Sequence, residues 1–119
     1  MVFIVKENRT FDNYFGTYPG ATGLPTGTCQ PSVLDHPSAG CVKPFVLDGT
    51  HPTQLSATDA ILAGQTDGGK MDGFVAAYTA QGRSGAAVMG YYDGKAVPFY
   101  WNVANSCEEY AKSNTWCSS

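Results

Sequence analysis

Two adjacent oxygen-bearing side chains near the N-terminus are the first candidates for chemistry. Glu7 and Asn8 directly follow a short apolar run. A carboxylate and an amide oxygen side by side are ligands that hard divalent cations accept. The next residue, Arg9, offers a planar guanidinium that can bind phosphate through two hydrogen bonds. Glu7 and Asn8 equally suit a surface turn, and Arg9 a salt bridge with Asp12, so the residue types alone leave the interpretation open.

The histidines and hydroxyl side chains are weaker candidates. His51 lies in a Gly-Thr-His-Pro stretch, where an imidazole can contact an anionic group or simply face solvent. His36, in a similar stretch, carries less weight, and we interpret Lys70 and Asp72 as a solvent-exposed pair. Serines and threonines are numerous, but none stands in a Gly-x-Ser-x-Gly nucleophile elbow, and two histidines alone indicate no catalytic triad.

The chain has four cysteines, Cys29, Cys41, Cys107 and Cys117. Their spacing suits two local disulfides, Cys29–Cys41 and Cys107–Cys117, each contributing about 2 to 4 kcal/mol to stability. Such bonds need an oxidising compartment. Four reduced, partly buried thiols are the alternative. Zinc is weakly supported, because the sequence has no Cys-x-x-Cys pair and only two histidines to complete a ligand set.

The elements that must position these residues begin with one buried strand. In residues 2–6, β-branched and aromatic residues follow one another without alternating with polar ones. This is typical of a strand in a parallel sheet that is covered on both faces. Glu7 and Asn8 would then lie where an open α/β sheet presents its ligand crevice. The following residues, Thr10–Phe15, are predicted as a short helix with Thr10 as its N-cap. We expect the aromatic residues of this helix to pack it onto the sheet.

Glycine- and proline-rich connections separate the remaining elements. Residues 16–54 hold six of the seven prolines, and so long a stretch without regular structure indicates a functional or covering loop. Helices are predicted over residues 55–63, 70–82 and 99–112. Gly64 is expected to close the first of these, and Pro98 to stand in the first turn of the last. One clear strand has no partner in this pattern, which indicates the opening of a larger α/β fold.

Composition limits the classes of function. The 119 residues suit one domain, and 43% hydrophobic residues are enough for a core. A net charge of −3 with few, scattered basic residues excludes a basic nucleic-acid binder. No apolar run approaches the roughly 20 residues that span a bilayer. The start of the chain lacks the pattern of a secretory signal, so we expect a cytoplasmic protein or, as the cysteines favour, a secreted or periplasmic one whose start lies upstream.

Three blocks of sequence carry a more specific signal when they are taken in order. They are ENRTFDNYFGT (7–17), GKMDGF (69–74), and MGYYDG with VPFYW (89–94 and 97–101). Together they resemble the bacterial phosphoesterase family, which holds the non-specific phospholipases C and a related group of acid phosphatases. In the first block the family usually has Ser where this chain has Thr10, and His where it has Asn13.

The resemblance implies a fold, a reaction and a set of roles. The fold would be an alkaline-phosphatase-like α/β/α sandwich, with residues 1–119 forming the N-terminal part of a single domain. The reaction would be metal-dependent hydrolysis of phosphate esters or phospholipids, in which a Ser or Thr attacks phosphorus to form a phosphoenzyme. Glu7 and Asn8 would hold the divalent cation, and His51 would contact the substrate phosphate. The family nucleophile and an Asp pair lie downstream, so we expect them beyond Ser119 and expect this chain to be inactive alone.

A different class of function also fits the residues. The chain would then be a small secreted binding module without catalysis, held by the two predicted disulfides and using its aromatic residues as a contact surface. A gene remnant without activity is a third possibility. Metal identity, substrate and oligomeric state are left open by the sequence.

Overall fold

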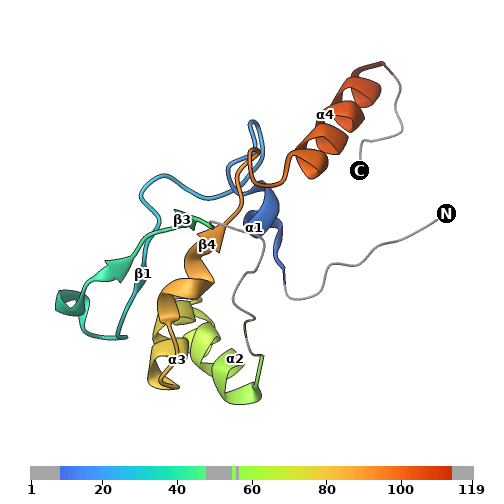
Figure 1. Cartoon of the computed structure of the whole chain (residues 1–119). Coiled ribbons are helices and arrows are strands. Elements are labelled where there is room, and N and C mark those ends of the chain that lie inside the picture. The colour runs from blue at the N-terminus through green and yellow to red at the C-terminus, as the bar shows by residue number, and fades with distance from the viewer. Residues whose placement is uncertain (1–8, 48–54, 56, 114–119) are drawn as a thin grey trace.

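The computed structural model of the chain describes residues 9–47, 55 and 57–113, which form several helices and a few very short strands (Figure 1). The helices are α1 (Phe11–Phe15), α2 (Asp59–Thr66), α3 (Phe74–Ala80) and α4 (Pro98–Ser113), with 3₁₀ helices η1 (Pro37–Ala39), η2 (Asp67–Gly69) and η3 (Gly85–Met89). The strands are β1 (Gln30–Pro31), β2 (Cys41–Val42), β3 (Phe45–Val46) and β4 (Gly90–Tyr91). The strand predicted over residues 2–6 lies outside the described residues.

The four described strands form two separate pairs. β1 and β2 are antiparallel, with Gln30 opposite Val42, whereas β3 and β4 are parallel, with Phe45 opposite Gly90. The mixed helix and strand content agrees with the predicted α/β class. The described residues do not confirm an α/β/α sandwich, and that part remains a prediction. Residues 16–47, predicted to lack regular structure, instead contain β1, β2 and β3.

One of the two predicted disulfides is confirmed. Cys29 and Cys41 are bonded, with their Cα atoms 5.6 Å apart, and the bond closes the loop that contains the β1–β2 pair. The reduced-thiol and zinc alternatives are therefore wrong for this pair. A loop of this length contributes about 3 kcal/mol to stability. The predicted partner bond involves Cys117, which lies outside the described residues.

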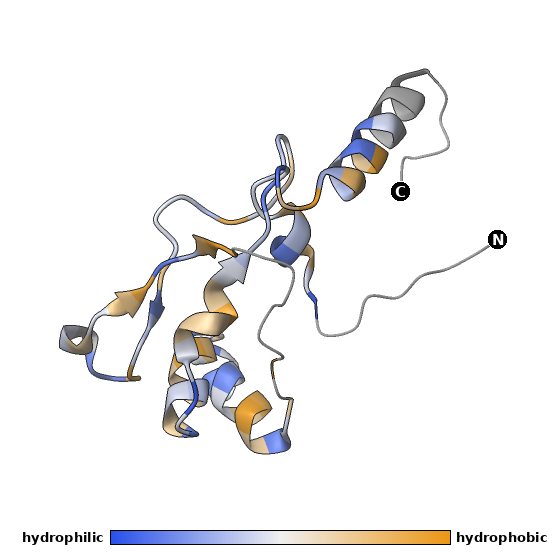
Figure 2. Cartoon of the chain, viewed as in Figure 1, coloured by the Kyte–Doolittle hydropathy of each residue, from blue (hydrophilic) through white to orange (hydrophobic). Residues whose placement is uncertain are grey.

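The α2–α3 helical pair holds the principal buried core, with Ile61, Val75 and Tyr78 almost fully buried. Apolar residues recur along α2, α3 and the neighbouring η3 (Figure 2). The predicted helix over 55–63 is displaced, because the Thr58 hydroxyl accepts a hydrogen bond from the Ile61 N–H at 3.4 Å and caps a helix that begins at Asp59.

Gly64 does not close α2, contrary to the prediction. The helix continues to Thr66, and Asp67 takes the left-handed conformation at its end, with φ 39°. Gly64 is instead a packing residue, since a Cβ there would lie 2.9 Å from the Cβ of Ala77 on α3. The second predicted helix, 70–82, is shorter than expected, because residues 70–73 form the connection that brings the chain into α3.

The last helix agrees with its prediction. α4 spans Pro98–Ser113 with proline at its first position. It extends away from the α2–α3 pair (Figure 1). Phe99 is 70% exposed and Val103 51% exposed, so the described part of this helix leaves apolar side chains uncovered. None of the described helices is long and apolar enough to cross a membrane.

Candidate functional site

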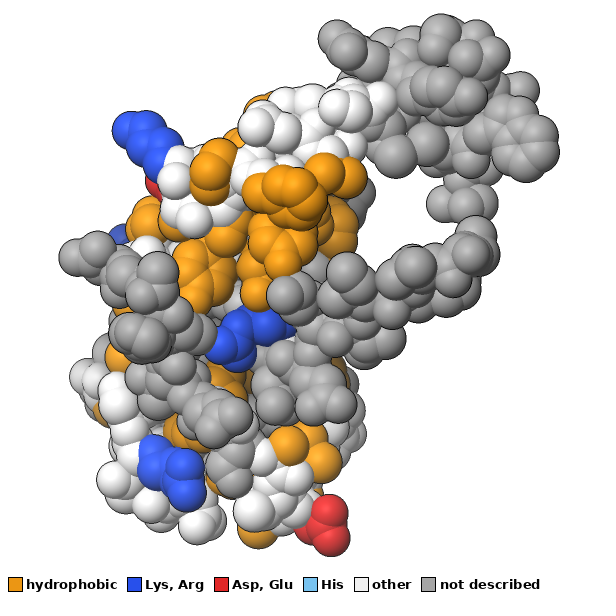
Figure 3. Space-filling model, turned by 45° about the vertical axis from the view of Figure 1, so that its right-hand side comes forward, with side chains coloured by type: hydrophobic (Ala, Val, Ile, Leu, Met, Phe, Trp, Pro, Cys, Tyr) orange, Lys and Arg blue, Asp and Glu red, His pale blue; other side chains and the backbone are white. Residues whose placement is uncertain are grey.

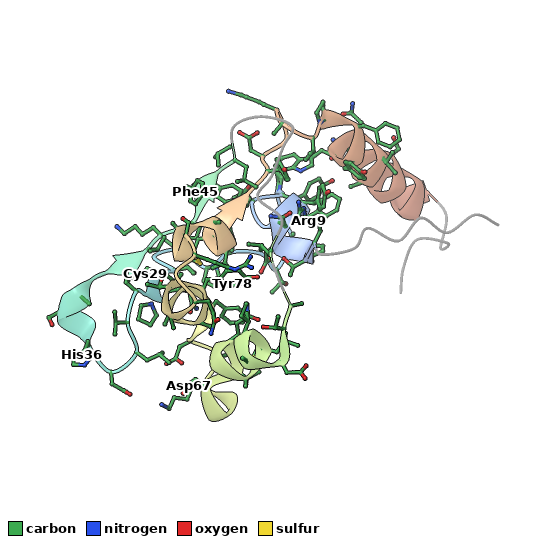
Figure 4. All side chains as sticks on the ribbon, turned by 60° about the horizontal axis from the view of Figure 1, so that its bottom comes forward. Arg9, Cys29, His36, Phe45, Asp67 and Tyr78 are labelled. Carbon is green, nitrogen blue, oxygen red and sulfur yellow. A yellow bond between two sulfur atoms is a disulfide. The ribbon has the colours of Figure 1, made fainter. Side chains whose placement is uncertain are left out.

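The predicted metal ligands Glu7 and Asn8 and the predicted phosphate contact His51 lie outside the described residues. The structure does describe the chain that follows the first two directly, from the half-buried Arg9 into α1. Figure 4 labels Arg9 beside α1 and His36 far from it, at the tip of the disulfide-closed loop. His36 is exposed, in keeping with the small weight given to it.

The start of α1 has the predicted cap. The Thr10 hydroxyl accepts a hydrogen bond from the Asn13 N–H at 3.3 Å, and the Thr10 carbonyl accepts from the same N–H at 3.2 Å. Threonine in place of the family's usual serine keeps the hydroxyl that this cap needs. The backbone donor of Asn13 is consequently used inside the helical turn.

Asn13 also connects α1 to β4, 77 residues away in the sequence. Its side-chain Nδ2 donates to the Gly90 carbonyl at 2.7 Å. Its backbone carbonyl accepts from the Tyr92 N–H at 2.8 Å. The first and third motif blocks therefore meet in space, which their separation in the sequence did not reveal.

Tyr14 extends this contact to α4. The Trp101 indole Nε1 donates to the Tyr14 carbonyl at 2.9 Å. The Tyr14 ring lies 5.7 Å from the Tyr92 ring and 5.1 Å from the Tyr100 ring. These aromatic residues pack elements together, as expected. We call this contact the α1–β4 joint; it consists of Asn13, Tyr14, Gly90, Tyr92 and Trp101.

The joint lies along β4, one strand of a parallel pair, and includes Tyr92, the residue that follows this strand. β3 and β4 run in the same direction, and the Leu47 N–H donates to the Tyr91 carbonyl at 2.7 Å. Gly90 permits this pairing, because a Cβ there would lie 2.5 Å from the Leu47 side chain. The carboxyl ends of parallel strands are where open α/β sheets bind ligands. The chain leaving β3 runs next into residues 48–54, which include His51.

The second motif block forms the corner between α2 and α3. Gly73 is buried, and a Cβ on it would lie 1.9 Å from the Gly64 carbonyl oxygen. The Gly73 N–H donates to the Gln65 carbonyl at 3.3 Å. This glycine of the motif is thus explained by close backbone packing. The corner also holds Asp72, whose Oδ1 is buried without a hydrogen-bond partner.

Lys70 of this block forms an ion pair with Asp67, which precedes the block, and not with Asp72 as the sequence had suggested. The Lys70 Nζ lies 2.9 Å from the Asp67 Oδ2. That hydrogen bond raises the pKa of Lys70 and lowers the pKa of Asp67. The lysine side chain is 63% exposed, which limits what the pair adds to stability.

An open apolar groove of about 450 Å³ runs beside α1. Its lining consists of aromatic and small residues: Phe11, Phe15, Tyr18, Pro19, Gly20, Ala21 and Ala104. Phe11 is 57% exposed, and the Tyr18 hydroxyl donates to Asn105 on α4. Figure 3 shows hydrophobic side chains gathered on the face of the molecule beside α4.

The described residues do not themselves complete a metal site. Among residues 9–47, 55 and 57–113, no three His, Cys, Asp or Glu side chains are grouped to hold a metal ion. The metal-ligand roles of Glu7 and Asn8 therefore remain a prediction. Sequence reasoning missed Asn13 as a connecting residue, because no local feature distinguishes it from the neighbouring polar residue Asp12.

Comparison with known proteins identifies a family. The sequence model of the Phosphoesterase family matches residues 1–118, almost the whole chain. No solved structure matches it.

Proposed function

The chain belongs to the Phosphoesterase family, and from that premise we propose that it serves metal-dependent hydrolysis of phosphate esters of the phospholipase C or acid phosphatase type. Family membership implies a hydrolase that acts on ester bonds and takes a phosphate ester as substrate. The metal dependence, the phosphoenzyme and the individual residue roles are the proposal.

Glu7 and Asn8 are the proposed holders of the divalent cation. One carboxylate and one amide oxygen suit a hard cation such as Mg²⁺, Mn²⁺ or Ca²⁺, and two protein ligands leave further positions to water and substrate. When bound, the cation stabilises negative charge on the phosphoryl oxygens. The observation that supports the proposal is the α1–β4 joint, because it holds α1, which begins three residues after Asn8, along the edge of β4 in a parallel strand pair.

His51 is the proposed contact for the substrate phosphate. Support comes from chain connectivity, since β3 ends at Val46 beside β4 and the chain then enters the segment that includes His51. Protonated imidazole both donates hydrogen bonds and carries positive charge, which suits a phosphoryl oxygen.

The proposed reaction has two steps. A Ser or Thr hydroxyl oxygen forms a bond to phosphorus while the bond to the ester oxygen breaks, and the hydroxyl proton ends on the departing alcohol. Water then attacks the phosphoenzyme, which releases phosphate, or a phosphomonoester from a diester substrate, and restores the hydroxyl. We assign the nucleophile to none of the described residues.

A secreted or periplasmic location is part of the proposal. The Cys29–Cys41 disulfide supports it, because such bonds persist in oxidising compartments. The same bond also favours the second candidate function, a disulfide-held binding module without catalysis, for which the groove beside α1 would serve as contact surface.

Calorimetric titration of the purified chain with Mn²⁺ tests the proposed metal role. We expect binding that weakens by about tenfold or more in Glu7→Gln, which removes the charge and keeps the size. Asp59→Asn, an exposed acid on α2, is the matched control and should bind as the parent does. Equal binding by the parent and Glu7→Gln would contradict the proposal.

Inorganic phosphate added to the Mn²⁺-loaded chain tests the anion contact. We expect heat of binding that decreases in His51→Gln and is unchanged in His36→Gln. A response that is the same in both variants would remove His51 from the site. Binding of neither Mn²⁺ nor phosphate would favour the non-catalytic module.

A further inference from the structure

We propose that the Cys29–Cys41 disulfide is a redox-sensitive switch built into the fold. Its reduction by a dithiol that attacks at Cys41 releases residues 29–47 from the rest of the described chain and leaves the α2–α3 helical pair folded. This inference goes beyond the proposed function and does not depend on it, because it uses none of the proposed metal or phosphate contacts.

The β1–β2 pair is too small to hold itself together. Each strand has two residues, and Pro31 has no N–H to donate to the ladder. The Ser32 N–H donates to the Gly40 carbonyl at 3.1 Å and adds one bond beside the pair. None of the four residues of β1 and β2 is buried, and isolated two-stranded pairs are marginal in water. The bond between Cys29 and Cys41 is therefore what keeps these strands paired.

A buried polar atom also works against the closed pair. The Gln30 Oε1 on β1 is buried and has no hydrogen-bond partner among the described residues. Such a group is costly while it is kept from water, and separation of β1 from its surroundings would hydrate it. Once the disulfide is removed, this cost favours the open arrangement.

The β1–β2 pair in turn positions β3. β1 contacts α3, which places the pair against the helical core. Only Lys43 and Pro44 separate β2 from β3, and the fixed φ of proline stiffens this connection. Both residues of β3 are exposed, and β3 is held on β4 by few bonds, among them the one from the Leu47 N–H to the Tyr91 carbonyl. Opening of the β1–β2 pair therefore favours separation of β3 from β4.

The α2–α3 pair does not share this dependence on the disulfide. Its side chains Ile61, Val75 and Tyr78 are almost fully buried, and neither helix contains a cysteine. Regions of one fold can open separately when their stabilising contacts are separate. Because disulfides persist in oxidising compartments and are reduced elsewhere, the β3–β4 pair is completed only where the Cys29–Cys41 bond forms.

Exposure decides where the reductant attacks. Cys41 is exposed, whereas Cys29 is half-buried. A thiolate of the dithiol forms a bond to the Cys41 Sγ while the Sγ–Sγ bond breaks, and Cys29 leaves as a thiolate that takes up a proton. The second thiolate of the reductant then attacks the reductant sulfur bound to Cys41, which releases Cys41 as a thiol and closes the reductant to a disulfide. The protein gains two electrons and two protons, and the dithiol loses them.

Hydrogen exchange of a Cys107→Ser/Cys117→Ser chain, with and without dithiothreitol, tests the switch. In this background only the Cys29–Cys41 bond can react. After reduction we expect the Leu47 amide to exchange about a hundredfold faster. The Ala77 amide, which donates to the Gly73 carbonyl at 2.8 Å, should change by less than about threefold. Reoxidation with glutathione disulfide should restore the protection of Leu47.

Two results would overturn the switch. Unchanged Leu47 exchange after reduction would show that the disulfide does not hold β3, and equal acceleration at Ala77 would show that it holds the whole described fold. Cys29→Ser/Cys41→Ser in the same background is the matched control. It should exchange at Leu47 as the reduced chain does, and a further response to dithiothreitol in this variant would also contradict the proposal.

Glutathione, a monothiol, tests the point of attack. Without a second thiol it stops at the mixed disulfide, which mass spectrometry of peptides can locate. We expect glutathione on Cys41. Glutathione found mainly on Cys29 would contradict attack at the exposed sulfur.

Discussion

In the α1–β4 joint, directional hydrogen bonds join residues 77 or more positions apart, whereas in the α2–α3 corner glycine backbones and small side chains touch over a few turns of chain. The corner depends on the absence of side-chain atoms at Gly64 and Gly73. The joint depends on the presence of particular donors, on Asn13 and Trp101. Both regions carry blocks of the family pattern. The comparison therefore separates motif residues that allow close backbone packing from motif residues that join distant elements by hydrogen bonds.

The largest effect is expected at the corner. Gly73→Ala places a methyl group 1.9 Å from the Gly64 carbonyl oxygen, and we expect the free energy of unfolding to fall by about 3 kcal/mol. Urea denaturation followed by circular dichroism measures it. Gly27→Ala is the control, because open space surrounds Gly27 and only its positive φ adds strain, at about 1 kcal/mol. Similar losses in both variants would refute the close-packing explanation.

A smaller effect is expected from the indole donor of the joint. Trp101→Phe keeps an aromatic ring and leaves the Tyr14 carbonyl without this donor, so the free energy of unfolding should fall by about 1.5 kcal/mol. Asn102→Ala, an exposed change on the same helix, should cost less. Denaturation curves that coincide for the parent and Trp101→Phe would show that this hydrogen bond does not contribute to stability.

The cap of α1 provides a finer test. Thr10→Ala removes the hydroxyl that accepts from Asn13, and we expect a loss of about 1 kcal/mol in thermal or urea unfolding. Thr10→Ser keeps the hydroxyl and should match the parent. We also expect Mn²⁺ binding to be weaker in Thr10→Ala only. If Thr10→Ala were as stable as Thr10→Ser, the hydroxyl would not cap the helix.

The smallest effect concerns the exposed ion pair at the corner. Because Lys70 lowers the pKa of Asp67, the stabilisation is present above the ordinary pKa of an aspartate and is lost as pH falls through the lowered value. The parent should therefore become slightly more stable relative to Asp67→Asn as pH rises towards 3.8, the ordinary pKa of an aspartate. Salt should reduce the difference. If the stability of the two proteins changed with pH in the same way, the ion pair would make no contribution to stability.

Local signals explain which elements the sequence could predict. Thr10 before an aromatic helix, Pro98 at the start of α4 and the spacing of Cys29 and Cys41 each act over a few residues, and each prediction is confirmed. The prediction that Gly64 ends the helix was wrong. In the sequence, a glycine that ends a helix cannot be told from one that lets a neighbouring helix pack closely.

Long-range pairing explains what the sequence did not reveal. The β3–β4 strands have two residues each, too few for an alternation pattern, and they join segments over 40 positions apart. The bond between Asn13 and Gly90 carries no local signal, since its geometry arises only when α1 meets β4. For the candidate site, the family pattern supplied Glu7, Asn8 and His51, and their roles stay predictions.

Paramagnetic broadening of amide signals by Mn²⁺ tests the central claim most directly, because it locates a bound cation relative to both regions. We predict that substoichiometric Mn²⁺ broadens the amide signals of Arg9, Asn13 and Tyr92 and leaves those of Ile61 and Val75 sharp. In Glu7→Gln none of these signals should broaden. Broadening centred on Asp67 and Asp72, or broadening that persists in Glu7→Gln, would contradict a cation held beside the α1–β4 joint.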